Sequence, residues 1–458
     1  MKNTKQSYIL GAIIISAGGF ISKILGAVYR IPLTNVLGGE GMGIYQMVYP
    51  LYCILLTVSA SGIPTGIARL ISSGRGIGAE KLAFRIYGAV GVIGTLLMFM
   101  LSEPLAALQG EPSVALCCKM LSPAVFFVSI LSVVRGYFQG RGNMLPTAIT
   151  EVAEQVIKVA FGIALSFTFK DNLPLAVAST LAAVTASEVI STFGAYLYYL
   201  KNRPRLPLFK EKSIDASSIL KYTIPLTLTA IAMPLSQLAE SVVAVRLLRG
   251  MTTEATALYG IYSGCAVTII NLPVSVTYGL AASSVPQISP LAESGNMSAA
   301  KKKAYKALLI TLLVSAPAAV GLYIFAPLAA KIIFGSLSQA ERGTLVTLVR
   351  IMAVCSITQS LVQTSSACLT SLGKPVLSTV TQWVTSLLRV GLLAVLLTAT
   401  PLGINGAAWA ANCAYLVATL LNIWYIINVK RGNQKDENNA DRIGECMRRF
   451  NASGQSRA

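Results

Sequence analysis

The chain has 458 residues, of which 54% are hydrophobic and only 12% are charged. Soluble domains carry about 25% charged residues, so these fractions exclude a water-soluble globule, a disordered chain and a fibre. The chain contains no His, which removes the usual general base and the commonest metal ligand. A chain this apolar is expected to be a membrane protein. For its net charge of +19, the question is then where the cations lie relative to the bilayer.

Apolar runs of about 20 residues are expected to form membrane helices, and the sequence contains twelve of them. In chain order they cover residues 8–28, 43–68, 86–101, 116–134, 145–169, 173–200, 222–245, 258–283, 308–333, 345–369, 376–398 and 404–429. The sequence therefore predicts an all-α polytopic membrane protein.

The positions of Lys and Arg predict how these helices are oriented. Most of the 37 Lys and Arg residues fall in the loops that follow even-numbered spans and in the two ends of the chain. Cytoplasmic loops carry an excess of such residues, so we expect a multi-pass protein of the cell membrane with both termini in the cytoplasm. This placement accounts for the positive charge without a nucleic-acid partner.

Two internal matches divide the chain into halves. Residues 142–159 align without gaps to residues 373–390, and a GIY triplet occurs at 43–45 and again at 260–262. Because six spans return the chain to its starting side, the matches predict a parallel repeat of two six-helix lobes around a central cavity. We expect an N-terminal lobe at 1–200, a basic cytoplasmic linker at 201–221, a C-terminal lobe at 222–429 and a polar cytoplasmic tail at 430–458.

Charged and amide side chains within the spans are the candidate site residues, because a charge at membrane depth is costly unless it faces a cavity or a partner. The candidates for binding substrate in the cavity are Lys23, Arg30, Gln237, Glu240, Arg246, Gln382 and Arg389. For Arg246, near a span end, the alternative is a side chain that extends to the lipid headgroups. The spans hold slightly more cations than acids, which favours an anionic cargo such as a phosphate.

Three charged residues of the fifth span form a separate group. Glu151, Glu154 and Lys158 lie within two helical turns, and Glu154 precedes Lys158 by four residues. This spacing and polarity favour an ion pair on one helix face. The group is expected to be a structural ion pair or to take part in ion coupling.

Other sequence features argue against an enzyme. The eight Cys residues contain no CxxC pair, so neither a metal site nor a disulfide framework is expected. The chain has no GxxxxGK[ST] phosphate-binding motif, and we expect no cofactor. Any driving force would then come from a coupling ion or a downhill gradient.

Several motifs resemble the stage V sporulation protein B family, a branch of the multidrug/oligosaccharidyl-lipid/polysaccharide (MOP) flippase superfamily. They are GFISKILGAVYR at 19–30, LGGEGMGIY at 37–45, SGIP at 61–64, and NLP at 271–273 with PQI at 286–288. The resemblance covers about residues 5 to 430.

The resemblance implies a flippase that moves undecaprenyl-diphosphate-linked cell-wall precursors, lipid II or a related oligosaccharide lipid, from the inner to the outer leaflet. It implies alternating access and a role in peptidoglycan, spore cortex or polysaccharide biosynthesis. Lys23 and Arg30 lie where the related MurJ-type lipid II flippases place cavity arginines. The chain departs from that group at 47–52 and 266–271, which hold no cation, and it lacks two of the fourteen spans usual there.

Three other functions remain open from the sequence. A proton- or sodium-coupled multidrug exporter of the same superfamily would use an acidic cavity built from residues such as Glu151 and Glu240. A membrane-embedded transferase would depend on carboxylates for acid–base chemistry. The third alternative is a scaffold for cell-wall or spore assembly that transports nothing.

Overall fold

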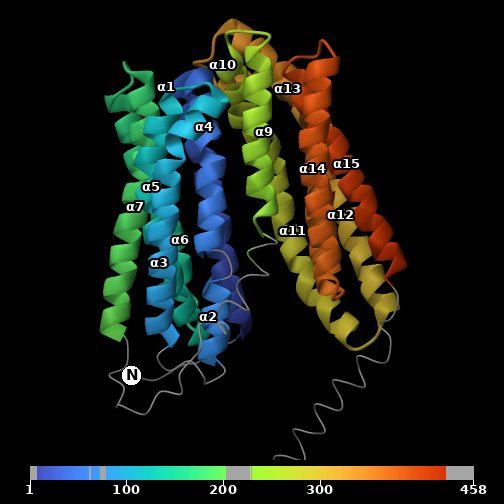
Figure 1. Ribbon diagram of the computed structural model, residues 1–458. Coiled ribbons are helices and arrows are strands. Elements are labelled where there is room, and N and C mark those ends of the chain that lie inside the picture. The colour runs from blue at the N-terminus through green and yellow to red at the C-terminus, as the bar shows by residue number, and fades with distance from the viewer. Residues whose placement is uncertain (1–7, 61–62, 73–78, 203–226, 228–229, 430–458) are drawn as a thin grey trace, which may run out of the picture.

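The computed structural model describes residues 8–60, 63–72, 79–202, 227 and 230–429, and every regular element in these ranges is a helix. The N-terminal bundle contains α1 (Tyr8–Ala60), α2 (Ile63–Ser72), α3 (Ala79–Met100), α4 (Ser102–Gln109), α5 (Ser113–Gly140), α6 (Leu145–Thr168) and α7 (Leu173–Asn202). The C-terminal bundle contains α9 (Ala232–Arg249), α10 (Ala255–Tyr259), the π-helix η1 (Gly260–Ala266), α11 (Val267–Glu293), α12 (Met297–Ile333), α13 (Gln339–Ser371), α14 (Pro375–Ala399) and α15 (Asn405–Asn428). The two bundles meet at one end and diverge toward the end where α1 begins and α15 finishes (Figure 1).

The predicted membrane helices are confirmed. Nine helical segments of the described chain are long and apolar enough to cross a bilayer. The segment in α1 contains two of the predicted spans, and α6 and α9 supply the remaining two crossings. Each of these two helices carries three charged residues, so neither is apolar enough to count among the nine. Such helices cross a membrane only when their charged side chains face other helices or a cavity rather than lipid. The described part of the chain therefore forms two bundles of six crossings each.

Helix α1 is a hairpin of two crossings rather than one straight rod. Its backbone leaves the helical region only at Gly38, where φ is +66°, a conformation that glycine adopts without steric cost. Arg30 and Tyr49 line the same cavity, although a straight helix would separate them by roughly 28 Å. The sequence predicted a loop between these spans, but the helical backbone continues on both sides of Gly38.

The internal repeat is visible in the turns that precede α6 and α14. Gly142 and Gly373, which the sequence alignment pairs, have φ values of +74° and +75°. In both turns the next backbone N–H donates to the carbonyl oxygen five residues earlier at 2.9 Å. The two paired turns thus have the same backbone conformation, which the helix ends at Gly110 and Gly295 also adopt.

Equivalent residues of the two halves touch where the bundles meet. A Cβ atom on Gly43 would lie 2.0 Å from the carbonyl oxygen of Thr256, and one on Gly260 would lie 2.0 Å from that of Gly39. Beside them, Gln46 Nε2 donates to the carbonyl oxygen of Ser263 at 2.8 Å. The second GIY triplet therefore packs against the first, and glycine allows the helices to approach this closely.

Polar contacts at the same end also join the bundles. Asn35 Oδ1 accepts hydrogen bonds from the backbone N–H and the hydroxyl of Ser336, at 3.3 and 3.0 Å. Arg249 pairs with Glu111 at 2.9 Å and also donates to the carbonyl oxygen of Gly110. These contacts close one end of the space between the bundles.

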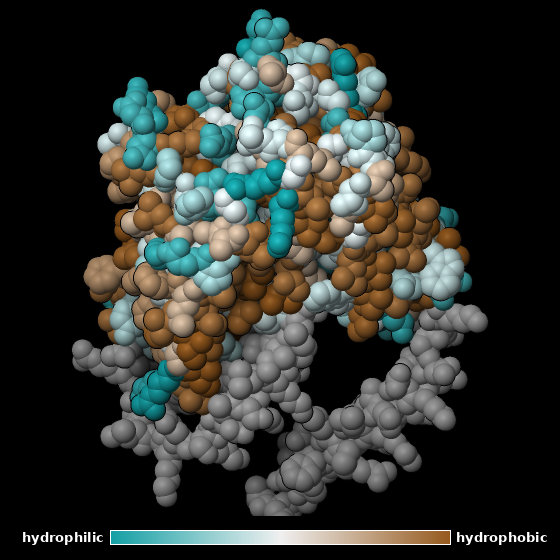
Figure 2. All heavy atoms as spheres, turned by 45° about the horizontal axis from the view of Figure 1, so that its top comes forward, coloured by the Kyte–Doolittle hydropathy of each residue, from teal (hydrophilic) through white to brown (hydrophobic). Residues whose placement is uncertain are grey.

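The flanks of the molecule are apolar, as a lipid-facing surface requires. Large aliphatic side chains such as Ile332, Val376 and Leu387 are more than two-thirds exposed. Figure 2 shows apolar side chains over the flanks and polar side chains gathered toward the end where the bundles meet. Nearly all of the predicted linker at 201–221 and the whole predicted tail at 430–458 lie outside the described residues.

Candidate functional site

A cavity lies between the two bundles, and its first compartment has a volume of about 440 Å³. Side chains of α1 and α6 form one wall, and side chains of α11 and α13 form the other. Two further compartments, of about 300 and 350 Å³, adjoin it. Arg30, Tyr49 and Asn271 also line the second compartment, and Gln363 also lines the third.

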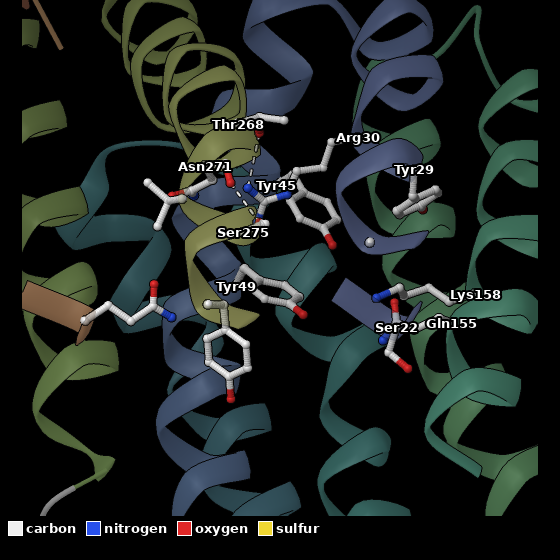
Figure 3. A pocket seen from close by; sticks show the side chains of 14 residues that line it. Ser22, Tyr29, Arg30, Tyr45, Tyr49, Gln155, Lys158, Thr268, Asn271 and Ser275 are labelled. Atoms are coloured by element: carbon white, nitrogen blue, oxygen red, sulfur yellow. Dashed lines mark hydrogen bonds between the residues drawn. The ribbon is translucent and has the colours of Figure 1, made fainter. Parts of the chain in front are cut away.

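Arg30 is the main cation of the first compartment. It projects from α1, is half-buried, and donates from Nη1 to the hydroxyl of Thr268 on α11 at 3.2 Å. Figure 3 shows its guanidinium group extending toward α11, close to Thr268 and Asn271. The hydrogen bond orients Arg30 across the space between the bundles without neutralising it.

Lys158 of α6 supplies a second cation on the N-terminal wall. Its side chain is only 9% exposed, and its ammonium nitrogen lies 5.9 Å from the centre of the Tyr29 ring, a cation–π arrangement. Figure 3 places it with Ser22 and Gln155. No acidic residue lines this compartment, and no carboxylate of the described chain forms an ion pair with Lys158 or Arg30.

Tyrosine side chains complete the N-terminal wall. The rings of Tyr45 and Tyr49 stack with their centres 5.4 Å apart and an angle of 17° between their planes. The hydroxyl of the buried Tyr29 has no hydrogen-bond partner among the described residues. The wall therefore combines positive charge with hydroxyl groups that can donate to an anion.

Arg389 lies in the second and third compartments, but a carboxylate compensates its charge. Its Nη2 lies 2.6 Å from Oε2 of Glu240, and the hydroxyl of Tyr262 donates to the other oxygen of Glu240 at 2.8 Å. Glu240 is almost fully buried. The structure thus joins two predicted substrate ligands, one from α9 and one from α14, into a neutral pair at the cavity wall.

The predicted pairing of Glu154 with Lys158 is not what the structure contains. Glu154 pairs with Arg135 at 2.5 Å, and Arg135 also donates to Thr150 at 2.9 Å. Arg135 was expected in a loop, but α5 extends to Gly140 and brings it against α6. Lys158, on the same helix as Glu154, forms no ion pair with a carboxylate of the described residues, although Glu154 and the buried Glu188 are near enough to interact with it electrostatically. The half-buried Glu151 faces Gly19 of α1.

The remaining predicted site residues are divided between the cavity and the surface. Gln237 lines the second compartment and Gln382 lines the third. Arg246 is exposed in the last turn of α9 and lines no compartment. The side chain of Lys23 lies outside the described part of the chain.

Several lining residues were not selected from the sequence. They are uncharged, namely Tyr45, Tyr49, Thr268, Asn271, Gln359 and Gln363. Gln359 and Gln363 are four residues apart on α13 and stand out in the sequence as polar residues of an otherwise apolar span, but they were not chosen as candidate ligands. Thr268 and the tyrosines carried no such signal, because these residue types are common in packed helices.

Comparisons with known proteins agree on a family and a fold. The family described as Polysaccharide biosynthesis protein matches residues 9–292. Stage V sporulation protein B of Bacillus subtilis is 27% identical over 439 residues, which are 91% of this chain and 83% of that protein. Lipid II flippase MurJ of the same organism is 24% identical over 351 residues, covering 68% of this chain and 63% of that protein.

Solved transporter structures share the architecture. An inward-facing multidrug resistance MATE family transporter of the MOP superfamily superposes with a TM-score of 0.76 and 17% identity, over 92% of this chain and 99% of the other. A MOP superfamily transporter from Pyrococcus furiosus, described as having a binding pocket of reverse polarity, gives 0.65 and 19%, over 91% and 95%. Together with the sequence relatives, these matches make the chain a membrane flippase or transporter.

Proposed function

We propose a lipid-flipping function for this chain, which belongs to the polysaccharide biosynthesis protein family. Its cargo is an undecaprenyl-diphosphate-linked saccharide, lipid II or a related cell-wall or spore-cortex precursor, carried from the inner to the outer leaflet. The proposal depends on one observation, which is that two cations, Arg30 and Lys158, lie on a cavity wall to which the described residues contribute no carboxylate.

Cavity electrostatics supports this choice of cargo. A charged group at the bilayer centre costs at least about 2.5–3.5 kcal/mol, and a diphosphate carries more than one charge. Charge-assisted hydrogen bonds from Arg and Lys offset that cost inside the cavity. The polyprenyl chain needs no such help and can stay in the lipid while the headgroup crosses.

The arrangement of the bundles supports alternating access. The lobes at 1–200 and 222–429 would rock about the end where they meet, with 201–221 as the link between them. The opening lies at the end where α1 begins and α15 finishes, and the excess of Lys and Arg in the corresponding loops supports a cytoplasmic location for this end. The cavity would then receive the headgroup from the inner leaflet, with a coupling ion or the membrane potential as driving force.

The proposal is tested by transport in proteoliposomes containing a fluorescent lipid II analogue. We expect the native chain to expose the headgroup to an external quencher, and Arg30→Gln and Lys158→Gln each to slow this by tenfold or more. Arg246→Gln is the matched control, because it removes the same charge as Arg30→Gln from an exposed position outside the cavity. A native chain that moves no lipid-linked saccharide, or variants as fast as the control, would contradict the proposal.

The rival function is export of cationic drugs by an ion-coupled mechanism. The acidic residue at the cavity wall is Glu240, and Arg389 neutralises it at 2.6 Å, which leaves no net negative charge to attract a cation. A drug-resistance assay in a sensitised host separates the two functions. Protection that survives Arg30→Gln would favour the exporter.

A further inference from the structure

The third compartment of the cavity differs in chemistry from the first. It has a volume of about 350 Å³, within the range of small-molecule sites, and lies entirely in the C-terminal bundle. Amide and hydroxyl side chains line it beside apolar surface, among them those of Ser236, Gln359, Gln363, Thr381, Gln382 and Tyr415.

The charge of this compartment is balanced. Among the described residues Arg389 is the one charged residue that lines it. Glu240, which lines the adjoining second compartment, pairs with this guanidinium group at 2.6 Å. An anion would therefore be stabilised much less in this compartment than beside Arg30 and Lys158. The walls suit an uncharged ligand that both donates and accepts hydrogen bonds.

Two amide side chains on these walls are available for a ligand. Gln363 has a buried carbonyl oxygen without a hydrogen-bond partner in the described chain. Gln382 makes no side-chain hydrogen bond to the described residues, and it is exposed. A buried amide oxygen without a partner costs free energy, and a ligand hydroxyl would supply the missing donor.

The first and third compartments are directly connected. Gln363 and Val274 line both of them. At their border, Gln359 Nε2 donates to Asn271 Oδ1 at 3.3 Å, and Asn271 also lines the first compartment with Arg30. A single ligand could therefore occupy the cationic part and the uncharged part at once.

We infer that the C-terminal compartment binds the saccharide of the lipid-linked cargo, while Arg30 and Lys158 hold its phosphates. This inference rests on the proposed function and names the part of the site that recognises the sugar. Sugar hydroxyls match amides and hydroxyls as partners, and Tyr415 offers an aromatic ring with a polar tip. The sugar contacts would therefore determine which lipid-linked saccharide is accepted, because a site built for hydroxyl groups rejects ligands that lack them.

Binding to the full chain in nanodiscs tests the inference with two probes. One is undecaprenyl diphosphate, and the other is undecaprenyl diphosphate bearing an N-acetylhexosamine disaccharide. We expect Gln363→Leu and Gln382→Leu to weaken binding of the sugar-bearing probe by about tenfold, the loss of one or two hydrogen bonds, and to leave the sugar-free probe unchanged. Arg30→Gln should weaken both probes alike.

Matched controls keep the outcomes distinct. Gln287→Leu makes the same substitution at an exposed position of α11 outside these compartments, and thermal unfolding verifies that each variant is folded. If Gln363→Leu and Gln382→Leu weaken binding of both probes equally, or of neither, the inference is overturned. The proposed function then stands if Arg30→Gln still weakens binding of both probes. Failure of both probes to bind the native chain overturns the proposed function together with the inference.

Discussion

Two cavity arginines, Arg30 and Arg389, differ in what surrounds them. Arg30 contacts a threonine hydroxyl at 3.2 Å, whereas Arg389 is paired with a buried carboxylate at 2.6 Å. An unpaired cation in a cavity attracts an anionic ligand, while a paired one mainly joins helices. The two arginines therefore contribute differently, Arg30 to binding and Arg389 to the packing of α14 against α9.

The Glu240–Arg389 pair yields a prediction about stability. Glu240→Gln should lower the free energy of unfolding by about 3–5 kcal/mol, because it leaves the guanidinium group buried without its counter-charge. Thermal unfolding in detergent measures the effect. The double variant Glu240→Gln with Arg389→Gln should recover most of the loss.

Glu103→Gln is the control for this prediction. It breaks the Lys119–Glu103 pair, in which the Glu103 side chain is 68% exposed, and exposed pairs contribute less than about 1 kcal/mol. Equal losses from the buried and the exposed pair would show that the carboxylate of Glu240 does not hold Arg389.

At the residue scale, the sequence identified a charged residue that lines the cavity but did not identify which residues form ion pairs between helices. The position of Arg30 within an apolar run was enough to mark it for a cavity. The four-residue spacing of Glu154 and Lys158 suggested a pair, but Arg135 approaches from another helix and takes the carboxylate at 2.5 Å. Contacts between helices depend on packing, which helix periodicity alone does not determine.

At the scale of elements, the close crossing of α1 with α10 and η1 depends on glycine. Gly43→Ala would bring a methyl group to 2.0 Å from the carbonyl oxygen of Thr256, so the helices would have to separate. We expect a loss of about 3 kcal/mol in unfolding free energy, the upper part of the usual cost of overpacking, measured by thermal unfolding.

Gly279→Ala serves as the control for this crossing. Gly279 lies inside α11, and its new Cβ would meet no atom of another described element within 4 Å. Its replacement should leave stability unchanged or raise it by up to about 1 kcal/mol, because Ala is the better helix former. A Gly43→Ala variant as stable as this control would argue against a tight crossing.

The repeated turns before α6 and α14 give a further prediction. Gly142→Ala and Gly373→Ala should each destabilise the protein by about 1–2 kcal/mol, since both glycines have a positive φ that an L side chain disfavours. Thermal unfolding should give similar losses for the two variants. Gly321→Ala, in an uncrowded helical position of α12, should not share this loss.

Most helices were predictable because apolar runs of membrane length are rare outside membrane helices. The continuous helical backbone around Gly38 was not, because the glycines and polar residues at 34–41 look like a loop. Their role is a sharp turn between two helices that a single left-handed glycine makes possible. The short α4 was also missed, because eight residues carry too little periodicity to detect.

At the scale of the whole molecule, the bundles are held together at one end and separated at the other. The contacts of Asn35 with Ser336 and of Arg249 with Glu111 lie on the closed end. Asn35→Ala combined with Arg249→Ala should weaken that closure and increase the population that opens there. The expected shift in the equilibrium is up to about thirtyfold, because two polar contacts of about 1 kcal/mol each are lost.

The native Cys53, which lines the second compartment, reports this change. A membrane-impermeant maleimide should label it from the side of the termini in the native chain, and from both sides in the double variant. Subtracting the labelling of the same chains carrying Cys53→Ala isolates the signal of this residue. Labelling of the native chain only from the side opposite the termini would reverse the inferred direction of opening.

The contact between the two GIY triplets has a consequence for how such a chain can arise. Gly43 contacts Thr256, and Gly260 contacts Gly39. The offset of the GIY triplets makes Gly260 the equivalent of Gly43 and Thr256 the equivalent of Gly39, so the two contacts are the same contact made in both directions. This is the isologous pattern of a homodimer with a two-fold axis, here contained in one polypeptide. A self-pairing ancestor of half this length would have carried two identical faces. Gene fusion releases each face to mutate alone, so that one keeps Lys158 without an ion-pair partner among the described residues while the other pairs the equivalent Arg389 with Glu240.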